Sequence, residues 1–207
     1  MEIVIASTNL HKIREFRSLL KPLSSIDVLS LHNFPHYQPI TESGSTFQEN
    51  ALEKALHAAR TLQKIVLADD SGLVVPALNN APGIHSHRYA GDDATDAENR
   101  LKLLNAMENL QDMHRTAYFE CCLVLATPDG VKKSVTGICE GRIASDERGR
   151  NGFGYDSLFI KNEYDKTFAE LEEHTKNRIS HRHKAFEKLI PILETLFPNL
   201  ENSQPLE

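Results

Sequence analysis

The sequence predicts a mixed α/β fold, in which helices flank a central twisted sheet arranged in two lobes with a cleft between them. Two observations predict this class. Short apolar runs alternate with stretches of helical periodicity over the first third of the chain, and a long β-prone hairpin follows near its middle. The 207 residues suffice for a substantial core. We therefore expect residues 1–207 to form a single domain of two lobes.

A strand–helix unit begins the chain. Residues 3–6 are continuously apolar, which is typical of a strand covered on both faces. Residues 7–9 carry hydroxyl and amide groups that can cap a helix, and Pro22 is expected to end that helix. A second strand is predicted over 26–31. Residues 32–45 contain two prolines and one glycine, and predict a long loop of the kind that often carries function.

A second helix and a buried strand follow this loop. Residues 46–49 match a capping box, which predicts the start of the helix. The expected core face of the helix consists of Phe47, Ala51, Leu52, Ala55, Ala58, Ala59 and Leu62. The next strand is predicted over 65–68, and we expect it to end at the polar run 69–72. A turn near 79–83 and a helix over 94–107 come next.

The strongest hairpin signal lies in the second half of the chain. Residues 116–126 form a long β-prone run, and the Pro-Asp-Gly sequence at 128–130 predicts a turn. Residues 131–143 are the expected return strand. Gly137 and Gly141 are interpreted as bulges or bends within it.

The C-terminal part combines a loop with a helix. Residues 146–156 are polar and rich in glycine, which predicts a loop. One long helix is expected from Ser180, with a kink at Pro191. Its core face consists of Ala185, Leu189, Ile192, Leu193 and Leu196. The polar tail from about residue 199 is expected to fray.

Composition restricts the classes of function. The chain has 23 basic and 29 acidic residues and a formal net charge of −6, which argues against binding a nucleic-acid polymer. A small anionic ligand needs only a few local cations. The spacing of Cys121, Cys122 and Cys139 matches neither a disulfide framework nor a zinc site, so we interpret them as core residues in a reducing compartment. Without signal-peptide features or an apolar run of about 20 residues, we expect a cytoplasmic protein that does not bind membranes.

The first candidate site is the junction between the first strand and the first helix. Amides at a helix N-terminus, together with hydroxyls and a lysine, can bind an anion. The residues of this segment are Ser7, Thr8, Asn9, Leu10, His11 and Lys12. The glycines of a Walker loop are absent. A plain helix cap with a solvated lysine is the alternative interpretation.

The acidic pair Asp69 and Asp70 is the second candidate site. Ligands of α/β sheets gather beyond the carboxyl ends of strands. Adjacent side chains of a strand point to opposite sides, so only one carboxylate can face a cleft, where it could hold Mg²⁺ or accept a proton from water. The other is expected to anchor the turn, and a solvated acidic pair is the alternative. Because Glu49 is explained as a capping residue, Glu42 is interpreted as the second metal ligand.

A basic group near the C-terminus is the third candidate. With Ser180 as the N-cap, His181 and Arg182 fall in the first turn of a helix, where cations oppose the helix dipole and a bound anion would relieve that cost. The group consists of Lys176, Arg178, His181, Arg182, His183 and Lys184. A basic surface patch is the alternative.

A glycine-flanked aromatic residue is the fourth candidate. Phe153 lies between Gly152 and Gly154, where its ring can stack on a nucleobase, and a turn with a buried phenylalanine is the alternative. The histidine pairs at 85/87 and 181/183 have no third ligand near them in the sequence, which argues against zinc.

In combination, these segments resemble the inosine triphosphatase family, also called dITP/XTP pyrophosphatases. The resemblance runs in order from Ile3 to about Leu196. It is carried by residues 6–9, 12, 15–16, 44–47, 49–51, 68–73, 81–83, 86–91, 152–156, 176–177 and 180–182. The chain departs from the family pattern at Thr41–Glu42, where the family often has two acidic residues and this chain has one carboxylate.

The resemblance implies an elongated, two-lobed protein that is usually a homodimer and binds a purine nucleoside triphosphate in a central cleft. Members of the family hydrolyse the bond between the α- and β-phosphates with Mg²⁺ and release pyrophosphate and a nucleoside monophosphate. They prefer the deaminated nucleotides ITP, dITP and XTP, so their task is to cleanse the nucleotide pool.

The resemblance also implies roles for individual residues. Asp70 is implied to be the general base and a metal ligand, with Glu42 as the second metal ligand. The triphosphate is implied to bind Ser7, Thr8, Asn9, Leu10, His11, Lys12, Ser71 and Lys176. The base is implied to stack on Phe153 and to be recognised by Gly154, Tyr155, Asp156, His181 and Arg182.

Physical chemistry agrees with this interpretation. Attack on a phosphorus surrounded by negative oxygens requires cations and positioned amides, and preference for a 6-oxo purine requires donors that face the oxygen. Arg182 and the amides near Asp156 are our candidate donors. Two alternatives stay open: a pyrophosphatase for modified pyrimidine nucleotides, and a nucleotide-binding or sensing protein that has lost turnover.

Overall fold

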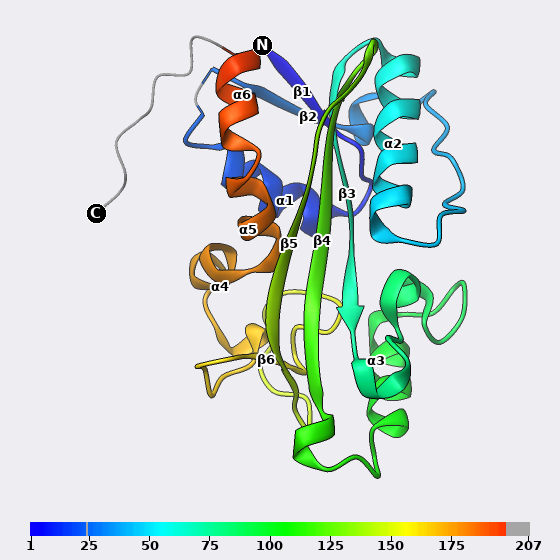
Figure 1. Ribbon diagram of the computed structural model, residues 1–207, viewed down its shortest axis with the longest axis vertical. Helices are drawn as coiled ribbons and strands as arrows, with labels where there is room; N and C mark the ends of the chain where they lie inside the picture. The colour runs from blue at the N-terminus through cyan, green and yellow to red at the C-terminus, as the bar shows by residue number, and fades with distance from the viewer. Residues whose placement is uncertain (24, 198–207) are drawn as a thin grey trace. The chain divides into compact units, whose positions relative to one another are not determined.

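The computed structural model describes residues 1–23 and 25–197 (Figure 1). The strands within these residues form a mixed sheet in the order β2-β1-β3-β4-β5-β6. Their bounds are β1 Glu2–Ile5, β2 Asp27–Ser30, β3 Ile65–Val74, β4 Thr116–Thr127, β5 Gly130–Ile143 and β6 Phe159–Lys161. The α-helices are α1 Leu10–Leu20, α2 Phe47–Leu62, α3 Asp96–Ala106, α4 Glu173–Ile179, α5 His181–Glu187 and α6 Ile190–Leu196. This arrangement confirms the predicted mixed α/β class. The predicted tail from about residue 199 lies outside the described residues.

The chain forms two compact units. Unit 1 comprises the described residues of Met1–Asp70 and Cys122–Thr136 together with 185–197. Unit 2 comprises Ser71–Cys121 and Gly137–Lys184. The long strands β4 and β5 run side by side as the predicted hairpin (Figure 1). The predicted cleft stays a prediction.

The core of unit 1 is built on β1. This strand pairs in parallel with β2 and β3, so that Ile3 lies opposite Val28 on one side and Ile65 on the other. Its three apolar residues are fully buried, as expected for a strand that is covered on both faces. Helix α1 adds Phe16 to this core. Helix α2 adds the small residues Ala51, Ala55, Ala58 and Ala59.

The core of unit 2 contains an aromatic cluster. The ring centroid of Phe159 lies 4.7 Å from that of Phe119 and 5.0 Å from that of Phe168, with edge-on geometry in both pairs. Strands β5 and β6 pair in antiparallel register, with Gly141 opposite Lys161. A Cβ at Gly141 would collide with the carbonyl oxygen of Ile160, so close backbone approach explains this glycine.

Two predicted boundaries are wrong. Strand β3 does not end at residue 68 but continues through the polar run to Val74, with Leu73 buried in the core of unit 2. The single helix expected from Ser180 is two helices, α5 and α6. Helix α6 begins after a break, with Pro191 in its first turn, where proline is well tolerated. Sequence reasoning also missed α4 and β6.

The predicted helix caps are confirmed. Asn9 caps α1, and its side-chain oxygen accepts hydrogen bonds from two backbone amides of the first turn. Thr46 caps α2 by accepting a hydrogen bond from the backbone amide of Glu49. The three cysteines are buried and form no disulfide. No helix within 1–23 and 25–197 is long and apolar enough to cross a bilayer.

Candidate functional site

The acidic pair of β3 lies where its partner strand β1 has ended. The register between the two strands stops at the pair of Ile5 and Leu67, and Leu67 lies two residues before Asp69. As expected for neighbours in a strand, the two carboxylates diverge. Asp69 Oδ2 lies 2.8 Å from Lys12 Nζ of α1, whereas Asp70 Oδ1 lies 3.0 Å from Lys54 Nζ of α2. We expected Asp69 to anchor a turn. No turn follows Asp69, because β3 continues to Val74, and its carboxylate pairs with Lys12.

Lys54 connects the two predicted metal ligands. Its ammonium donates to Glu42 Oε1 at 2.8 Å, to Asp70 Oδ1 at 3.0 Å and to the carbonyl oxygen of Asp69 at 2.9 Å. Sequence reasoning placed Glu42 and Asp70 at one site, and the structure brings both carboxylates to one ammonium. It did not identify Lys54 itself.

Asn50 is a second residue that sequence reasoning missed. It is buried one turn before Lys54 on α2, and its Nδ2 donates to Asp70 Oδ2 at 3.2 Å. Its Oδ1 accepts a hydrogen bond from the amide of Gly44 at 2.8 Å. A Cβ at Gly44 would lie 2.7 Å from Asn50 Oδ1, so the glycine permits this contact. The available signal was polar residues at i and i+4 on a helix face that is otherwise alanine-rich.

Burial and neighbouring charges raise the pKa values of both Lys54 and Asp70. Burial raises the pKa of the Asp70 carboxyl, and the nearby lysines Lys54 and Lys12 only partly offset this effect. Burial alone would lower the pKa of Lys54, but the carboxylates of Asp70 and Glu42 reverse the direction and hold it above its usual range. Lys54 is therefore a fixed cation, and Asp70 is a better proton acceptor than an exposed aspartate.

The segment that precedes α1 is ordered by its own side chains. Ser7 Oγ accepts a hydrogen bond from the amide of Asn9 at 3.1 Å, and Asn9 Oδ1 accepts from the amides of His11 and Lys12. The carbonyl oxygen of Thr8 lies 3.0 Å from Nε2 of His32, so that ring nitrogen carries the proton. A phosphate that binds here would therefore compete with the side-chain oxygens of Ser7 and Asn9 for these backbone amides.

The loop that carries Glu42 is tied to α2 at a second place. The hydroxyl of Tyr37 lies 2.9 Å from Nδ1 of His57, a residue of α2. Together with the ion pair between Glu42 and Lys54 and the hydrogen bond from Gly44 to Asn50, this contact fixes the predicted long loop to one helix.

In unit 2, the predicted aromatic loop folds around one carboxylate. Asp156 Oδ2 accepts a hydrogen bond from the amide of Phe153 at 2.9 Å and from Lys176 Nζ at 2.5 Å. The Lys176 ammonium lies 4.8 Å from the centroid of the Phe153 ring. Lys176 and Asp156 are both buried. The resemblance implied that Lys176 binds the triphosphate. In the structure its ammonium contacts Asp156 and Phe153, which the resemblance assigned to recognition of the base.

Two residues of helix α3 that sequence reasoning missed form hydrogen bonds with the same loop. Asp96 Oδ2 accepts a hydrogen bond from the amide of Gly154 at 2.7 Å, and Arg100 Nη1 donates to the carbonyl oxygen of Gly154 at 2.9 Å. Arg100 Nε also pairs with Glu147 Oε2 at 2.8 Å, and this oxygen accepts from the hydroxyl of Ser157. Both polar groups of one glycine are thus fixed by a single helix.

The remaining predicted residues of unit 2 are buried. Burial raises the pKa of Tyr155, whose hydroxyl donates to the carbonyl oxygen of Ser86. The ring of His181 stacks on Phe119 with centroids 4.7 Å apart. Arg182, which is only 2 % exposed, donates from Nη2 to Ser71 Oγ at 2.8 Å.

Each unit therefore holds one group of the predicted residues. Unit 1 holds the segment 7–12, Glu42 and Asp70, and unit 2 holds Ser71, the segment 153–156, Lys176, His181 and Arg182. Over the part of the chain that the structure describes, no three histidine, cysteine or acidic side chains gather as a metal site.

Comparison with known proteins identifies the family. The chain is 59% identical over 197 residues to a dITP/XTP pyrophosphatase of Protochlamydia amoebophila, covering 95% of this chain and 99% of that protein. It is 54% identical to a dITP/XTP pyrophosphatase of Chlamydia abortus, covering 95% and 96%. The solved Ham1 protein of Staphylococcus aureus superimposes with a TM-score of 0.83 at 43% identity, covering 95% of this chain and all of that one. Residues 3–192 match the Ham1 family. With this match and these identities over nearly the whole chain, the chain belongs to the Ham1 family.

Proposed function

We propose that this chain hydrolyses ITP, dITP and XTP to the nucleoside monophosphate and pyrophosphate, and so removes deaminated purines from the nucleotide pool. The relatives at 59% and 54% identity are dITP/XTP pyrophosphatases. The observation that carries the proposal is the buried Asp70 carboxylate, whose pKa is raised and whose oxygen contacts Lys54. A proton acceptor next to a fixed cation is what attack of water on a phosphate ester or anhydride requires.

In this proposal, Asp70 accepts a proton from water as the water oxygen bonds to the α-phosphorus. The bond from that phosphorus to the bridging oxygen breaks, and pyrophosphate leaves with the bonding electrons. Lys54 and Lys12 neutralise charge that builds up on the phosphate oxygens. The segment 7–12 donates backbone amides to the triphosphate.

Mg²⁺ belongs to the same proposal. In proteins this ion is commonly held by one or two carboxylates together with substrate phosphates and water. Glu42 and Asp70 fit that pattern, because both contact the Lys54 ammonium and therefore already accommodate a cation next to them. When bound, the ion supplies neutralisation of the phosphate charge and polarisation of the reacting phosphorus.

Unit 2 supplies base recognition in this proposal. Phe153 stacks on the purine, with Lys176 and Asp156 fixing its loop. Arg182 donates a hydrogen bond to the 6-oxo group, and Ser71 orients its guanidinium. A site that is built to satisfy such donors rejects adenine, since the donors would be left unpaired. Arg182→Ala should therefore bring the kcat/KM values for ITP and ATP closer together, and an unchanged ratio would exclude Arg182 from selection.

The decisive experiment identifies the bond that is cut. Purified protein is incubated with ITP, XTP, GTP, ATP and a modified pyrimidine triphosphate in H₂¹⁸O, with Mg²⁺ or with EDTA. We expect IMP and pyrophosphate from ITP in the presence of Mg²⁺, with ¹⁸O in the IMP. Orthophosphate and IDP, or tight ITP binding without product, would contradict the proposal. Asp70→Asn should nearly abolish turnover, whereas the matched change at the exposed Asp129 should not.

The proposal also includes a cytoplasmic homodimer, which is supported by the family resemblance. Light scattering of the purified protein at micromolar concentration tests the oligomeric state. A mass of one chain, about 23 kDa, would contradict the dimer.

A further inference from the structure

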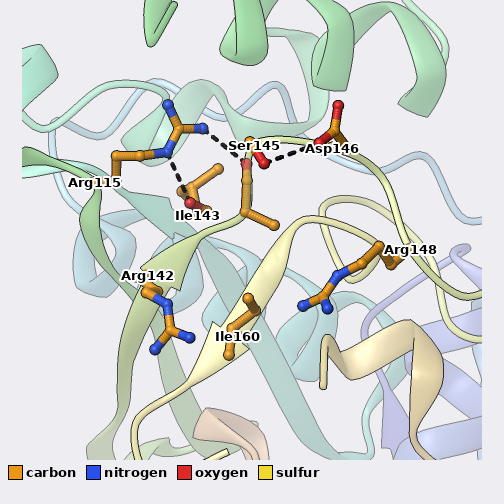
Figure 2. A pocket seen from close by; sticks show the side chains of 8 residues that line it. Arg115, Arg142, Ile143, Ser145, Asp146, Arg148 and Ile160 are labelled. Carbon is orange, nitrogen blue, oxygen red and sulfur yellow. Dashed lines mark hydrogen bonds between the residues drawn. The ribbon is translucent and has the colours of Figure 1, made fainter. Parts of the chain in front are cut away.

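A cavity of about 310 Å³ lies in unit 2 (Figure 2). None of the residues that line it belongs to either group of site residues described above. Three of its lining residues are arginines, Arg115, Arg142 and Arg148, and one is acidic, Asp146. The volume is at the lower end of the range for small-molecule sites.

Arg115 is a buried cation whose described partners are backbone carbonyls. It is 9 % exposed, and its guanidinium donates to the carbonyl oxygens of Ile143, Met107 and Ala144 at 2.9, 2.9 and 2.8 Å. Three of its five N–H groups are thus used, all on neutral acceptors. Apart from Asp112, whose side chain the structure does not describe, no acidic residue within 1–23 and 25–197 forms an ion pair with it. Burial of a charge is costly and neutral carbonyls offset that cost only in part, so an anion in the cavity would be favoured.

Arg142 brings a second cation to the cavity. It lies on β5 directly opposite Ile160 of β6, and its side chain is exposed. Within residues 1–23 and 25–197, the side chain of Asp112 excepted, it forms neither an ion pair nor a hydrogen bond. Its guanidinium is therefore available to a ligand.

Arg148 is only partly compensated. Its Nη2 donates to the carbonyl oxygen of Asp165 at 3.0 Å, and its Nε lies 3.6 Å from Glu170 Oε2, which is longer than a good hydrogen bond. Asp146, the acidic lining residue, accepts a hydrogen bond from the hydroxyl of Ser145. Figure 2 shows Arg142 and Arg148 on either side of Ile160. The lining thus carries three positive charges and one negative charge.

We propose that this cavity binds the phosphate group of a small molecule. Arg142 and Arg148 offer paired N–H groups that match phosphate oxygens. Arg115 contributes buried positive charge and donates to the carbonyl oxygen of Ala144, another lining residue. The apolar side chains of Ile143 and Ile160 reduce solvation of the arginines and strengthen their attraction for an anion.

A titration followed by NMR tests the proposal. ¹⁵N-labelled protein without added metal is titrated with sodium phosphate, with sodium pyrophosphate and with sodium chloride at matched ionic strength. We expect saturable shifts of the backbone amides of 144–148 with phosphate or pyrophosphate and none with chloride. The probe that binds more tightly identifies whether one or two phosphates are preferred. Binding to the segment 7–12 moves different amides, so the two sites are read separately.

Variants assign the binding to the arginines. Arg142→Gln should weaken the affinity about tenfold, because it removes one charged contact of roughly 1.4 kcal/mol. The matched change Arg60→Gln, at an exposed residue in the last turn of α2, should leave the affinity unchanged. Arg115 is kept intact because it supports three carbonyls. Shifts that rise linearly and are reproduced by chloride, or saturable shifts with unchanged affinity in Arg142→Gln, would overturn the proposal. No nucleotide is used, so the result is independent of the proposed hydrolysis.

Discussion

Lys54 Nζ lies 3.0 Å from Asp70 Oδ1, and this contact gives the second carboxylate of the acidic pair a partner of its own. Asp69 is paired with Lys12. Counted with Glu42, the group holds two positive and three negative charges. A triphosphate brings further negative charge, so the group needs an additional cation to bind it. This charge balance, rather than a preformed metal cage, is our physical reason to expect dependence on Mg²⁺.

Lys54→Met should reduce kcat/KM for ITP by about 10²-fold or more. The substitution keeps most of the side-chain volume but removes the cation that contacts both Glu42 and Asp70, and loss of one such electrostatic group typically costs two to three orders of magnitude. Steady-state kinetics with ITP and Mg²⁺ measure the effect. Lys64→Met is the control, because Lys64 pairs with Glu2 at an exposed position. Equal losses of kcat/KM in both variants would show that the contacts of Lys54 with Glu42 and Asp70 are not required for catalysis.

The pKa of Asp70 in the metal-free protein should lie above the usual aspartate value of about 3.9. Removing Lys54 should raise this pKa further, because the ammonium favours the ionised form. A ¹³C NMR titration of the labelled carboxyl in EDTA measures both values. Since the folded pKa exceeds the unfolded one, the contribution of this group to stability is complete below the unfolded pKa and is lost as pH rises through the folded pKa. A pKa at or below 3.9 in the wild type would contradict the expectation.

The start of a helix could be predicted from the sequence where a capping residue precedes it. Asn9 and Thr46 could be assigned from sequence because a cap is decided by residues within one turn. The divergence of Asp69 and Asp70 also follows from the geometry of any strand. The extent of β3 could not be read in the same way. Whether a polar run interrupts a strand depends on the neighbouring strand and on the core beyond it.

The partners of the site residues were the part that sequence could not supply. Lys54 and Asn50 meet Asp70 only because α2 packs against β3, 16 and 20 residues away along the chain. Asp96 and Arg100 reach Gly154 over 58 and 54 residues. A lysine or an asparagine on an amphipathic helix gives no indication by itself of which distant carboxylate it will contact.

The contact between α3 and the aromatic loop predicts a change in KM rather than in kcat. Arg100→Gln removes a charged donor to the carbonyl oxygen of Gly154, and such a bond is worth about 1.5 kcal/mol or more. We expect KM for ITP to rise about tenfold and kcat to stay within twofold. The residues proposed to bind the phosphates and to catalyse the reaction lie in unit 1 and are not changed by this substitution. Arg100→Lys should rescue only part of the loss, since an ammonium lacks the paired N–H geometry.

The control for this contact is Asp93→Asn, at an exposed position just before α3. Asp96→Asn should behave like Arg100→Gln, whereas Asp93→Asn should keep the wild-type KM. If Arg100→Gln lowered kcat alone, Arg100 would not act by positioning the loop.

Two glycines of the aromatic loop should differ sharply in their tolerance of alanine. Both have positive φ angles, +77° at Gly152 and +58° at Gly154, so each substitution costs about 1 kcal/mol in backbone strain. At Gly154 a Cβ would have no neighbour within 4 Å.

At Gly152 a Cβ would collide with Asp156 Oδ2, the oxygen that accepts hydrogen bonds from both the Phe153 amide and Lys176. Displacing that carboxylate leaves a buried lysine without its partner, which typically costs about 3 kcal/mol or more. Urea unfolding should therefore show Gly152→Ala to be less stable than Gly154→Ala by at least about 2 kcal/mol. Equal stability of the two variants would mean that the Asp156 carboxylate does not hold this loop.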